Sequence, residues 1–506
     1  MLKNRKIIKY FWLVSFIVLF GGVSFFHLWR LTIMPDGYYV DETSIGYNAA
    51  LISQTGKDEH NQSFPVFFKA FGEYKNPLYI YTTAVIFKVF GISELNLRLT
   101  SFIFYMGFLA GLYFLSETIF KKKIITLFAI FAAGFLPWFF SISRISFEVI
   151  SQLTVFIFAL YFAYKTYETE IKKDNFLYPI LTGFSGGLTV YTYTTSRFFA
   201  FVYIGLLLLV YLKKENWQKH LLAASGFLLS IIPYIYFSFQ YPGALTDRFR
   251  YITFLYDASL TGFEKISLFF KYYLTYFDLN FLLFKGDPNI RHHPGDVGMI
   301  FFIVFFLSII GLLYGIYLII KKKNRFWLFI FLNLILAPAA AALTVEYESL
   351  RSLFMGFYVL LFACLGFTFL LKFFLRNNLL PLILIIFIFL SLESYLFLEK
   401  YFVVYPKITT HAFEGSGFKD SLTASIKFNP NQIIVSTKGN NYSTNLGFYS
   451  LLLPNKDNIP IQIGANIAQK NQCLMINSWD KGIINKDNLP IKFVSDTNKF
   501  WQVKCF

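Results

Sequence analysis

The sequence predicts a polytopic α-helical membrane protein with a small domain at its C-terminal end. Of its 506 residues, 56% are hydrophobic and only 15% are charged, which is too apolar for a soluble globular protein. The formal charge of +17 is spread between the apolar runs, as a topology signal is, and is not gathered on one domain for nucleic acid. We therefore expect a lipid bilayer, and no nucleic acid, among the partners of the chain.

About eleven apolar runs are expected to span the bilayer. They lie at residues 11–29, 97–120, 124–141, 149–167, 177–196, 198–212, 220–238, 298–320, 326–343, 353–371 and 379–397. Runs of three lysines, at 121–123 and 321–323, stand at one end of these segments. The positive-inside rule makes that end cytoplasmic. This predicts a multi-pass protein of a bacterial-type plasma or inner membrane, with the N-terminus inside and the C-terminal tail outside.

Two domains follow from this arrangement. Residues 1–399 form the transmembrane domain, with long outer loops at 31–97 and 239–297, and residues 400–506 form a small extracytoplasmic domain of mixed α/β or β-rich type. Strand-like runs in the tail are predicted at 432–436, 459–463, 473–477, 491–495 and 501–506. Cys473 and Cys505 lie in these runs and can form a disulfide if the tail is outside the cytosol, whereas Cys364 is expected in the core.

The first outer loop carries adjacent acids, Asp41 and Glu42, at the start of a helix-like run. Asp41 fits two interpretations, a helix N-cap and a reactive carboxylate held in a fixed orientation. A second apolar run, Pro77–Phe90, has an expected cap before it and a glycine after it. At ~1.5 Å per residue it reaches only ~21 Å, short of the ~30 Å hydrocarbon core. We therefore predict that this helix lies in the membrane interface and does not span the bilayer.

The polar side chains of the outer face suit glycosyl transfer from a lipid carrier. An enzyme on that face has no nucleotide-sugar, and displacement at the anomeric carbon of a polyprenyl-phosphate sugar requires a base for the acceptor hydroxyl and cations for the departing phosphate. Asp41 is the candidate base. The candidate phosphate-binding cations are Lys75, Arg98, Arg144, Arg197 and Arg351. The alternative for each arginine is an interfacial anchor at the end of a span.

The second long loop adds a polar group that we interpret as an acceptor or donor loop. Its candidate residues are Lys285, Arg291, His292 and His293. The two histidines either bind a metal or the donor, or are ordinary loop residues. The sequence contains no zinc spacing, P-loop or dinucleotide fingerprint, so no cofactor is predicted, and a divalent metal stays open.

Four features of residues 38–101 together resemble the glycosyltransferase C superfamily: the Asp41-Glu42 pair, Lys75-Asn76-Pro77, Phe90-Gly91 and Arg98. The branch that they resemble most is that of the bacterial relatives of protein O-mannosyltransferases and lipid A aminoarabinose transferases. This resemblance implies Asp41 as base or acceptor-binding carboxylate, Glu42 as the second acid, and Lys75 and Arg98 near the donor phosphate. Aminoarabinose transferases have Thr-Arg after the acid pair, where this chain has Thr43-Ser44, which puts a lipid A acceptor in doubt.

The resulting prediction is an inverting glycosyltransferase that uses a polyprenyl-phosphate sugar and acts on a lipid, glycan or protein acceptor. The sugar is a hexose or a pentose. Two alternatives remain open at this stage: a polymerase or ligase of lipid-linked glycans, and a transporter of such lipids that is not an enzyme. A transporter requires polar residues at mid-membrane on several spans, whereas this sequence keeps its charges at the ends of the apolar runs.

Overall fold

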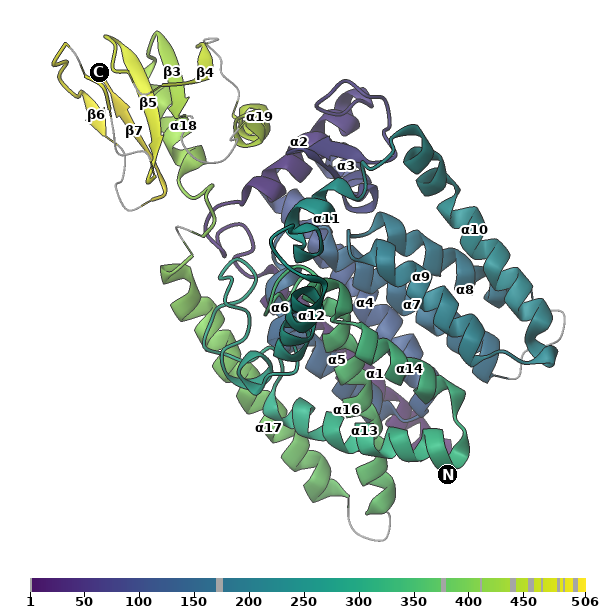
Figure 1. Ribbon diagram of the computed structural model, residues 1–506. Coiled ribbons are helices and arrows are strands. Elements are labelled where there is room, and N and C mark those ends of the chain that lie inside the picture. The colour runs from purple at the N-terminus through teal and green to yellow at the C-terminus, as the bar shows by residue number, and fades with distance from the viewer. Residues whose placement is uncertain are drawn as a thin grey trace.

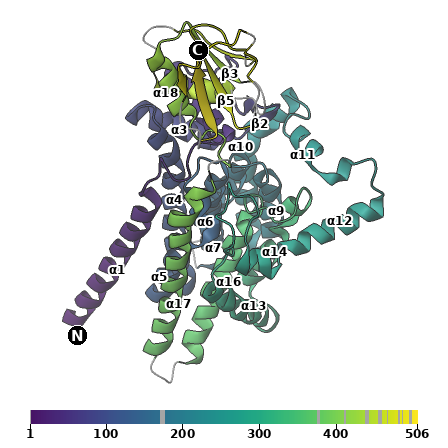
Figure 2. The same cartoon turned by 90° about the vertical axis from the view of Figure 1, so that its left-hand side faces the viewer.

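The computed structural model shows a bundle of long helices with a small sheet domain at one end (Figures 1 and 2). It describes residues 2–169, 176–374, 379–409, 412–436, 443–453, 459–465, 467–479, 483–485, 487–494 and 499–506. The helices of the bundle are α1 (Leu2–Leu28), α4 (Glu94–Phe120), α5 (Lys123–Phe135), α6 (Pro137–Ser143), α7 (Val149–Glu168), α8 (Leu177–Leu188), α9 (Ser196–Val210), α10 (Trp217–Gln240), α13 (Phe302–Lys322), α14 (Arg325–Leu336), α15 (Ala339–Ala342), α16 (Leu353–Phe373) and α17 (Leu380–Glu399).

The protein is a multi-pass membrane protein with fewer candidate spans than expected. In the described part of the chain, eight helices are long and apolar enough to cross a bilayer, or nine if α5 and α6, bent by 57°, form one broken span. The predicted spans at 177–196 and 198–212 are instead the 12-residue α8 and the 15-residue α9. At ~1.5 Å per residue, neither helix reaches ~30 Å by itself. The estimate of eleven thus counted two helices that are too short.

The hydroxyl-rich segment between α8 and α9 explains why they are short. After Leu188 the chain forms a 3-10 turn, Thr189–Tyr191, and α9 begins only at Ser196. Thr192 Oγ1 donates to the Thr189 carbonyl, and Ser196 Oγ donates to Gln152 Oε1 of α7, both at 2.6 Å. Such side-chain bonds compete with the helical pattern. The interruption brings polar residues 193–197 to the end of the bundle, where the site described below lies.

Glycine allows the closest helix contact in the bundle. A Cβ atom on Gly183 of α8 would lie 1.7 Å from the Ala223 carbonyl oxygen of α10, and one on Gly226 would lie 2.3 Å from the Ile180 carbonyl oxygen. The α13–α16 pair is built in the same way around Gly311 and Gly366. Small residues let helix backbones approach closely where lipid offers no hydrophobic driving force.

The first outer loop folds as two short helices and a hairpin. It contains α2 (Val40–Thr55), the antiparallel strands β1 (Phe68–Ala70) and β2 (Glu73–Lys75), and α3 (Pro77–Phe90). The 14 residues of α3 start with proline and end at Gly91, as predicted, and α3 is too short to be a candidate span. The N-cap of α2 is Tyr39, so the interpretation of Asp41 as the cap is wrong. Asp41 lies in the first turn, and its neighbour Glu42 accepts a hydrogen bond from the Tyr39 backbone N–H at 3.0 Å.

The second long loop carries α11 (Asp247–Ile252) and α12 (Gly262–Thr275), which project to one side of the bundle in Figure 2. Both helices lack a fully buried residue. The loop returns along residues 285–297 to the start of α13. It thereby brings two separate stretches, one around α11 and one around residue 291, to the same end of the bundle.

The C-terminal domain is a mixed five-stranded sheet with two helices, as predicted. Its elements are α18 (Phe418–Phe428), β3 (Gln432–Ser436), α19 (Ser443–Leu452), β4 (Ile461–Gly464), β5 (Gln472–Asn477), β6 (Phe493–Val494) and β7 (Trp501–Cys505), with strand order β4-β3-β5-β7-β6. β3 is parallel to both of its neighbours, and β7 is antiparallel to β5 and β6. Cys473 and Cys505 face each other in this register, 4.1 Å apart at Cα, and form the predicted disulfide.

Candidate active site

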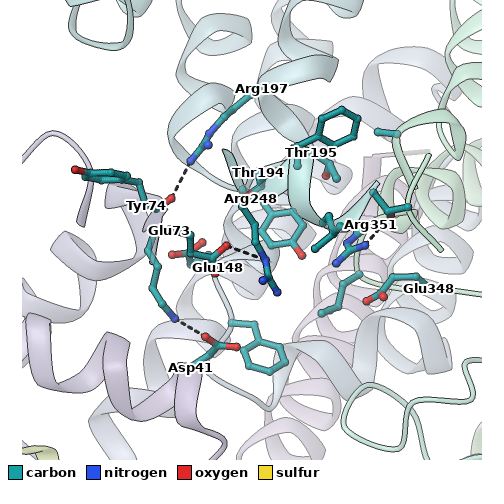
Figure 3. Close-up of a pocket in the computed structure, with 18 of the residues that line it drawn as sticks. Asp41, Glu73, Tyr74, Glu148, Thr194, Thr195, Arg197, Arg248, Glu348 and Arg351 are labelled. Atoms are coloured by element: carbon teal, nitrogen blue, oxygen red, sulfur yellow. Dashed lines mark hydrogen bonds and ion pairs between the residues drawn. The ribbon is translucent and has the colours of Figure 1, made fainter. Parts of the chain in front are cut away.

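A cavity of about 480 Å³ opens at the end of the bundle that carries the two long loops (Figure 3). Its walls come from the first loop, the start of α7, residues 193–198, the α11 segment, residues 289–292 and residues 340–351. Four acids line it, Asp41, Glu73, Glu148 and Glu348, together with five cations, Lys75, Arg197, Arg248, Arg291 and Arg351. The volume falls in the range of ~300–1,000 Å³ that is usual for small-molecule sites.

Asp41 and Lys75 form the ion pair that closes one side of the cavity. Lys75 Nζ lies 2.6 Å from Asp41 Oδ1, and the lysine side chain is 6% exposed against 35% for the aspartate. Lys75 is the last residue of the β1–β2 hairpin and is followed directly by Asn76 and Pro77, where α3 starts. The hairpin and the helix together hold Lys75 in place. Burial lowers the pKa of Lys75, but the carboxylates of Asp41 and Glu148 more than reverse this and raise it above its ordinary value. A buried ammonium therefore stands beside a carboxylate that solvent can reach.

Glu148 is a second acid on the cavity wall, at the start of α7. Its carboxylate accepts hydrogen bonds from the backbone N–H and the side-chain amide of Asn76, both at 2.9 Å. Burial raises the pKa of Glu148 to about 7, even though Lys75 and these hydrogen bonds act in the other direction. Near neutral pH this group therefore exists in both protonation states.

Two arginines stand on the opposite wall. Arg197, at the start of α9, donates to the carbonyl oxygens of Leu245 and Tyr74 at 3.0 and 3.1 Å and to Asn76 Oδ1 at 2.8 Å. Arg248 of α11 is half-exposed, and its Nε lies 3.3 Å from Glu73 Oε2. Figure 3 shows both side chains entering the cavity from different elements. Arg197 is fixed by three protein acceptors, whereas Arg248 keeps most of its donors for solvent or a ligand.

The remaining wall contains three of the predicted residues. Arg351 Nη1 donates to Thr344 Oγ1 at 2.6 Å. Arg291 stacks on the ring of Tyr39, with the guanidinium carbon 4.0 Å from the ring centroid. His292 Nδ1 lies 3.4 Å from Asp287 Oδ2. The structure thus brings candidate residues from distant parts of the sequence to one cavity.

Two residues of the predicted site lie behind the cavity and not in its lining. Glu42 and Arg98 are completely buried, and their side chains are 3.2 Å apart. All five N–H groups of Arg98 donate to protein acceptors: Glu42 Oε1, Glu42 Oε2 and the carbonyl oxygens of Leu31, Pro35 and Gly37. Glu42 also accepts from the Ser146 backbone N–H at 2.9 Å. This pair ties the two ends of the first loop together, and its place does not support the predicted contact with substrate.

Arg144, Lys285 and His293 are also outside the lining. Arg144 is fully buried and donates to the carbonyl oxygens of Phe26, His27, Trp29 and Met34. Lys285 is exposed at the surface. His293 is fully buried, and burial lowers its pKa to about 4, so the ring is neutral at neutral pH. Among the residues that the structure describes, no three His, Cys, Asp or Glu side chains form a group that could hold a metal ion.

Glu73, Glu148, Arg248 and Glu348 line the cavity but were not predicted as site residues. Arg248 lies in an aromatic loop whose sequence has no helical periodicity, so the direction of its side chain could not be predicted. Glu148 had a usable signal, since it follows Arg144 in a short connection between two apolar helices. A carboxylate in such a connection is a candidate for a site at the membrane surface.

Comparison with known families gives one match. Residues 74–237, about a third of the chain, match the model of the family described as dolichyl-phosphate-mannose-protein mannosyltransferase. That stretch begins one residue before Lys75 and includes Arg98, Glu148 and Arg197. No curated protein matches the sequence.

The fold is shared with solved membrane proteins of low sequence identity. ArnT from Cupriavidus metallidurans in the apo state matches with a TM-score of 0.60 and 12% identity, over 97% of this chain and 98% of that chain. ArnT bound to undecaprenyl phosphate matches with a TM-score of 0.55 and 13% identity, over 97% of each chain.

A third match is the archaeal oligosaccharyltransferase AglB from Archaeoglobus fulgidus, in complex with an inhibitory peptide and a dolichol-phosphate. It has a TM-score of 0.56 and 15% identity, and the match covers 88% of this chain and 64% of that chain. This chain therefore spans about two thirds of the length of AglB. The family match over residues 74–237 and the fold shared with ArnT agree with the resemblance to the glycosyltransferase C superfamily seen in the sequence.

Proposed function

We propose that the protein transfers a single sugar from a polyprenyl-phosphate carrier to a hydroxyl group of an acceptor, with inversion at the anomeric carbon. The observation that carries this proposal is the cavity itself, in which the accessible carboxylate of Asp41 lies among five cations. The match of ArnT in complex with undecaprenyl phosphate supports a donor of this class.

In this mechanism Asp41 acts as the general base. The acceptor hydroxyl loses its proton to the Asp41 carboxylate while its oxygen attacks the anomeric carbon, and the bond from that carbon to the phosphate oxygen breaks. A base in this role typically contributes ~10²–10⁴-fold. Glu148 is less suited to the role, because the backbone and side-chain amide of Asn76 occupy its carboxylate and it is only 8% exposed.

The departing phosphate requires positive charge, since no general acid is needed for such a leaving group. Lys75 and Arg248 are placed to supply it, from the first loop and from α11. Arg248 is the freer of the two, because its one ion pair is with the partly exposed Glu73. Exchanging that carboxylate for a phosphate is a change of partner, and an arginine can bond two phosphate oxygens at once.

The test is transfer by the purified, full-length protein from a panel of polyprenyl-phosphate hexoses and pentoses to lipid, glycan and peptide acceptors. We expect one donor to release free polyprenyl phosphate and a product of inverted configuration. Transfer only from diphosphate-linked oligosaccharides would favour a polymerase or ligase. Movement of an intact lipid-linked sugar across vesicles without a new glycosidic bond would favour a transporter and overturn the proposal.

A further inference from the structure

The C-terminal domain contributes a buried acid that pairs with Arg291 of the cavity wall. Glu414 lies in the connection before α18 and is 1% exposed, and its Oε1 is 2.9 Å from Nη2 of Arg291. Nε of the same arginine donates to the Ala412 carbonyl oxygen at 2.8 Å. Two N–H groups of the Arg291 guanidinium, Nε and Nη2, therefore donate to the C-terminal segment, although Arg291 itself belongs to the second long loop.

Arg291 passes this constraint on to the start of α2. Its guanidinium lies over the ring of Tyr39, and both side chains line the cavity. Tyr39 is the N-cap of α2 and stands two residues before Asp41. Nη1 of Arg291 donates no hydrogen bond to any of the residues that the structure describes, which leaves it available to a substrate oxygen.

The backbone around Glu414 is fixed independently of its carboxylate. The Gly415 N–H donates to the Tyr38 carbonyl oxygen at 2.9 Å, and Trp501 Nε1 donates to the Glu414 carbonyl oxygen at 2.7 Å. A Cβ on Gly37 would lie 2.3 Å from the Ser416 nitrogen, and Gly37 has a φ of +83°. The two segments approach so closely that only glycine fits, so the distance from Glu414 to the first loop is set by direct backbone packing.

We propose that Glu414 is a positioning residue of the glycosyltransferase, which holds Arg291 against Tyr39 and so shapes the cavity wall beside Asp41. The proposal rests on the function proposed above. It makes the C-terminal domain part of the catalytic unit through one ion pair, and Glu414 acts through Arg291 without touching the reacting atoms.

The experiment compares Glu414→Ala, Glu414→Gln, Arg291→Ala and the Glu414→Ala/Arg291→Ala double variant in the full-length protein. Misplacement of a substrate-binding group by about 1 Å can cost ~10²-fold. We expect Glu414→Ala to raise the KM for the donor ~10- to 100-fold with a smaller change in kcat, Glu414→Gln to recover part of the loss, and the double variant to be no worse than Arg291→Ala.

Asp36→Asn is the matched control. Asp36 Oδ2 accepts from Ser416 Oγ at 2.7 Å and from Lys499 Nζ at 2.6 Å, so it also joins the first loop to the C-terminal domain, but it does not line the cavity. If Glu414 served only to dock the domain, the two substitutions would have the same effect on KM. That result, or a double variant with the product of the single losses, would overturn the proposal.

Backbone hydrogen exchange gives a readout that does not depend on activity. We expect Glu414→Ala to speed exchange in residues 287–293, and Asp36→Asn to leave that segment as it is in the parent. Unchanged exchange and unchanged KM in Glu414→Ala would refute the positioning role. If the parent transferred no sugar from any donor but the exchange behaved as expected, the proposed function would fail while the positioning role of Glu414 stood.

Discussion

Two groups of arginines at the end of the bundle that carries the cavity have different surroundings. Arg98 and Arg144 are fully buried, and nine of their ten N–H groups donate to protein; the tenth, Arg144 Nε, has no partner among the residues that the structure describes. Arg197, Arg248, Arg291 and Arg351 line the cavity instead. The first group organises backbone, since it binds the carbonyl oxygens of residues 26–37. The second group is where we propose that the donor phosphate binds.

This difference shows that a buried cation is not by itself evidence of ligand binding. A guanidinium whose donors are all used by carbonyl oxygens stabilises a loop, and it has nothing left for a substrate. An arginine with one flexible carboxylate partner, such as Arg248, can exchange that partner. The following predictions test whether the two groups separate in this way, beginning with the largest expected effect.

Arg98→Ala should mainly unfold the protein. The substitution leaves the carboxylate of Glu42 buried without its partner, and breaking a buried pair in this way typically costs ~3–5 kcal/mol. Thermal unfolding of the detergent-solubilised variant measures the loss, with Arg248→Ala as the control from the other group. A parent-like unfolding midpoint together with weakened donor binding would instead indicate that Arg98 binds the substrate.

Asp41→Asn should fold and bind donor like the parent, but turn over at least ~100-fold more slowly, because the base is gone and the size is kept. Steady-state kcat and the unfolding midpoint are the two measurements. Glu117→Gln is a matched control, since Glu117 also pairs with a lysine, Lys123, at 2.5 Å but lies outside the cavity. Transfer at the parent's rate by the Asn variant would move the search for the base to Glu148.

Lys75→Ala and Arg248→Ala should each raise the donor KM by ~10- to 150-fold, which corresponds to the ~1.5–3 kcal/mol of one charge-assisted hydrogen bond. Arg250→Ala is the matched control, because Arg250 is on the same helix as Arg248 and pairs with Asp247 outside the lining. Equal effects for Arg248 and Arg250 would mean that α11 contributes only general positive charge.

For Glu148 we expect a pH dependence of stability. Burial raises its pKa from the ordinary 4.5 to about 7, so the folded state holds a proton that the unfolded state releases between these two values. The contribution of Glu148 is therefore fully present below about pH 4.5 and is lost as the pH rises through about 7, at no more than ~1.4 kcal/mol per pH unit. Unfolding midpoints of the parent and of Glu148→Gln between pH 5 and 8 check this, and parallel curves would contradict it.

The sequence was sufficient for the class of fold and for one part of the site. Asp41 and Lys75 could be predicted as candidates because each lies at the start of a helix that the sequence marks. Asp41 belongs to the acid pair before the helix-like run 44–54, and Lys75 precedes Asn76 and Pro77 at the start of α3. The disulfide partners could be found because both cysteines stand in strand-like runs of a short tail. In these cases local pattern and tertiary structure agree.

The other features of the candidate site and the short helices depend on tertiary contacts, which no local sequence pattern indicates. Arg98 and Arg197 both begin an apolar helix, and only the fold determines that Arg98 meets Glu42 whereas Arg197 meets the cavity. The short α8 and α9 were missed because residues 177–212 read as two apolar runs, while the bonds of Thr192 and Ser196 to their neighbours end the helices early. The place of Arg248 could not be predicted, because Arg248 reaches the cavity only when the second long loop folds back onto the bundle.

The close packing of Gly37 against Ser416 limits how such an enzyme can be recombined. A chimera that exchanges only the C-terminal domain would place a new loop against a backbone surface with no room for a side chain. Residues 36–39 and 412–416 therefore form a single unit of exchange, although the 372 residues of 40–411 separate them in the chain. An engineer who wishes to graft another C-terminal domain onto this scaffold should transfer both segments together.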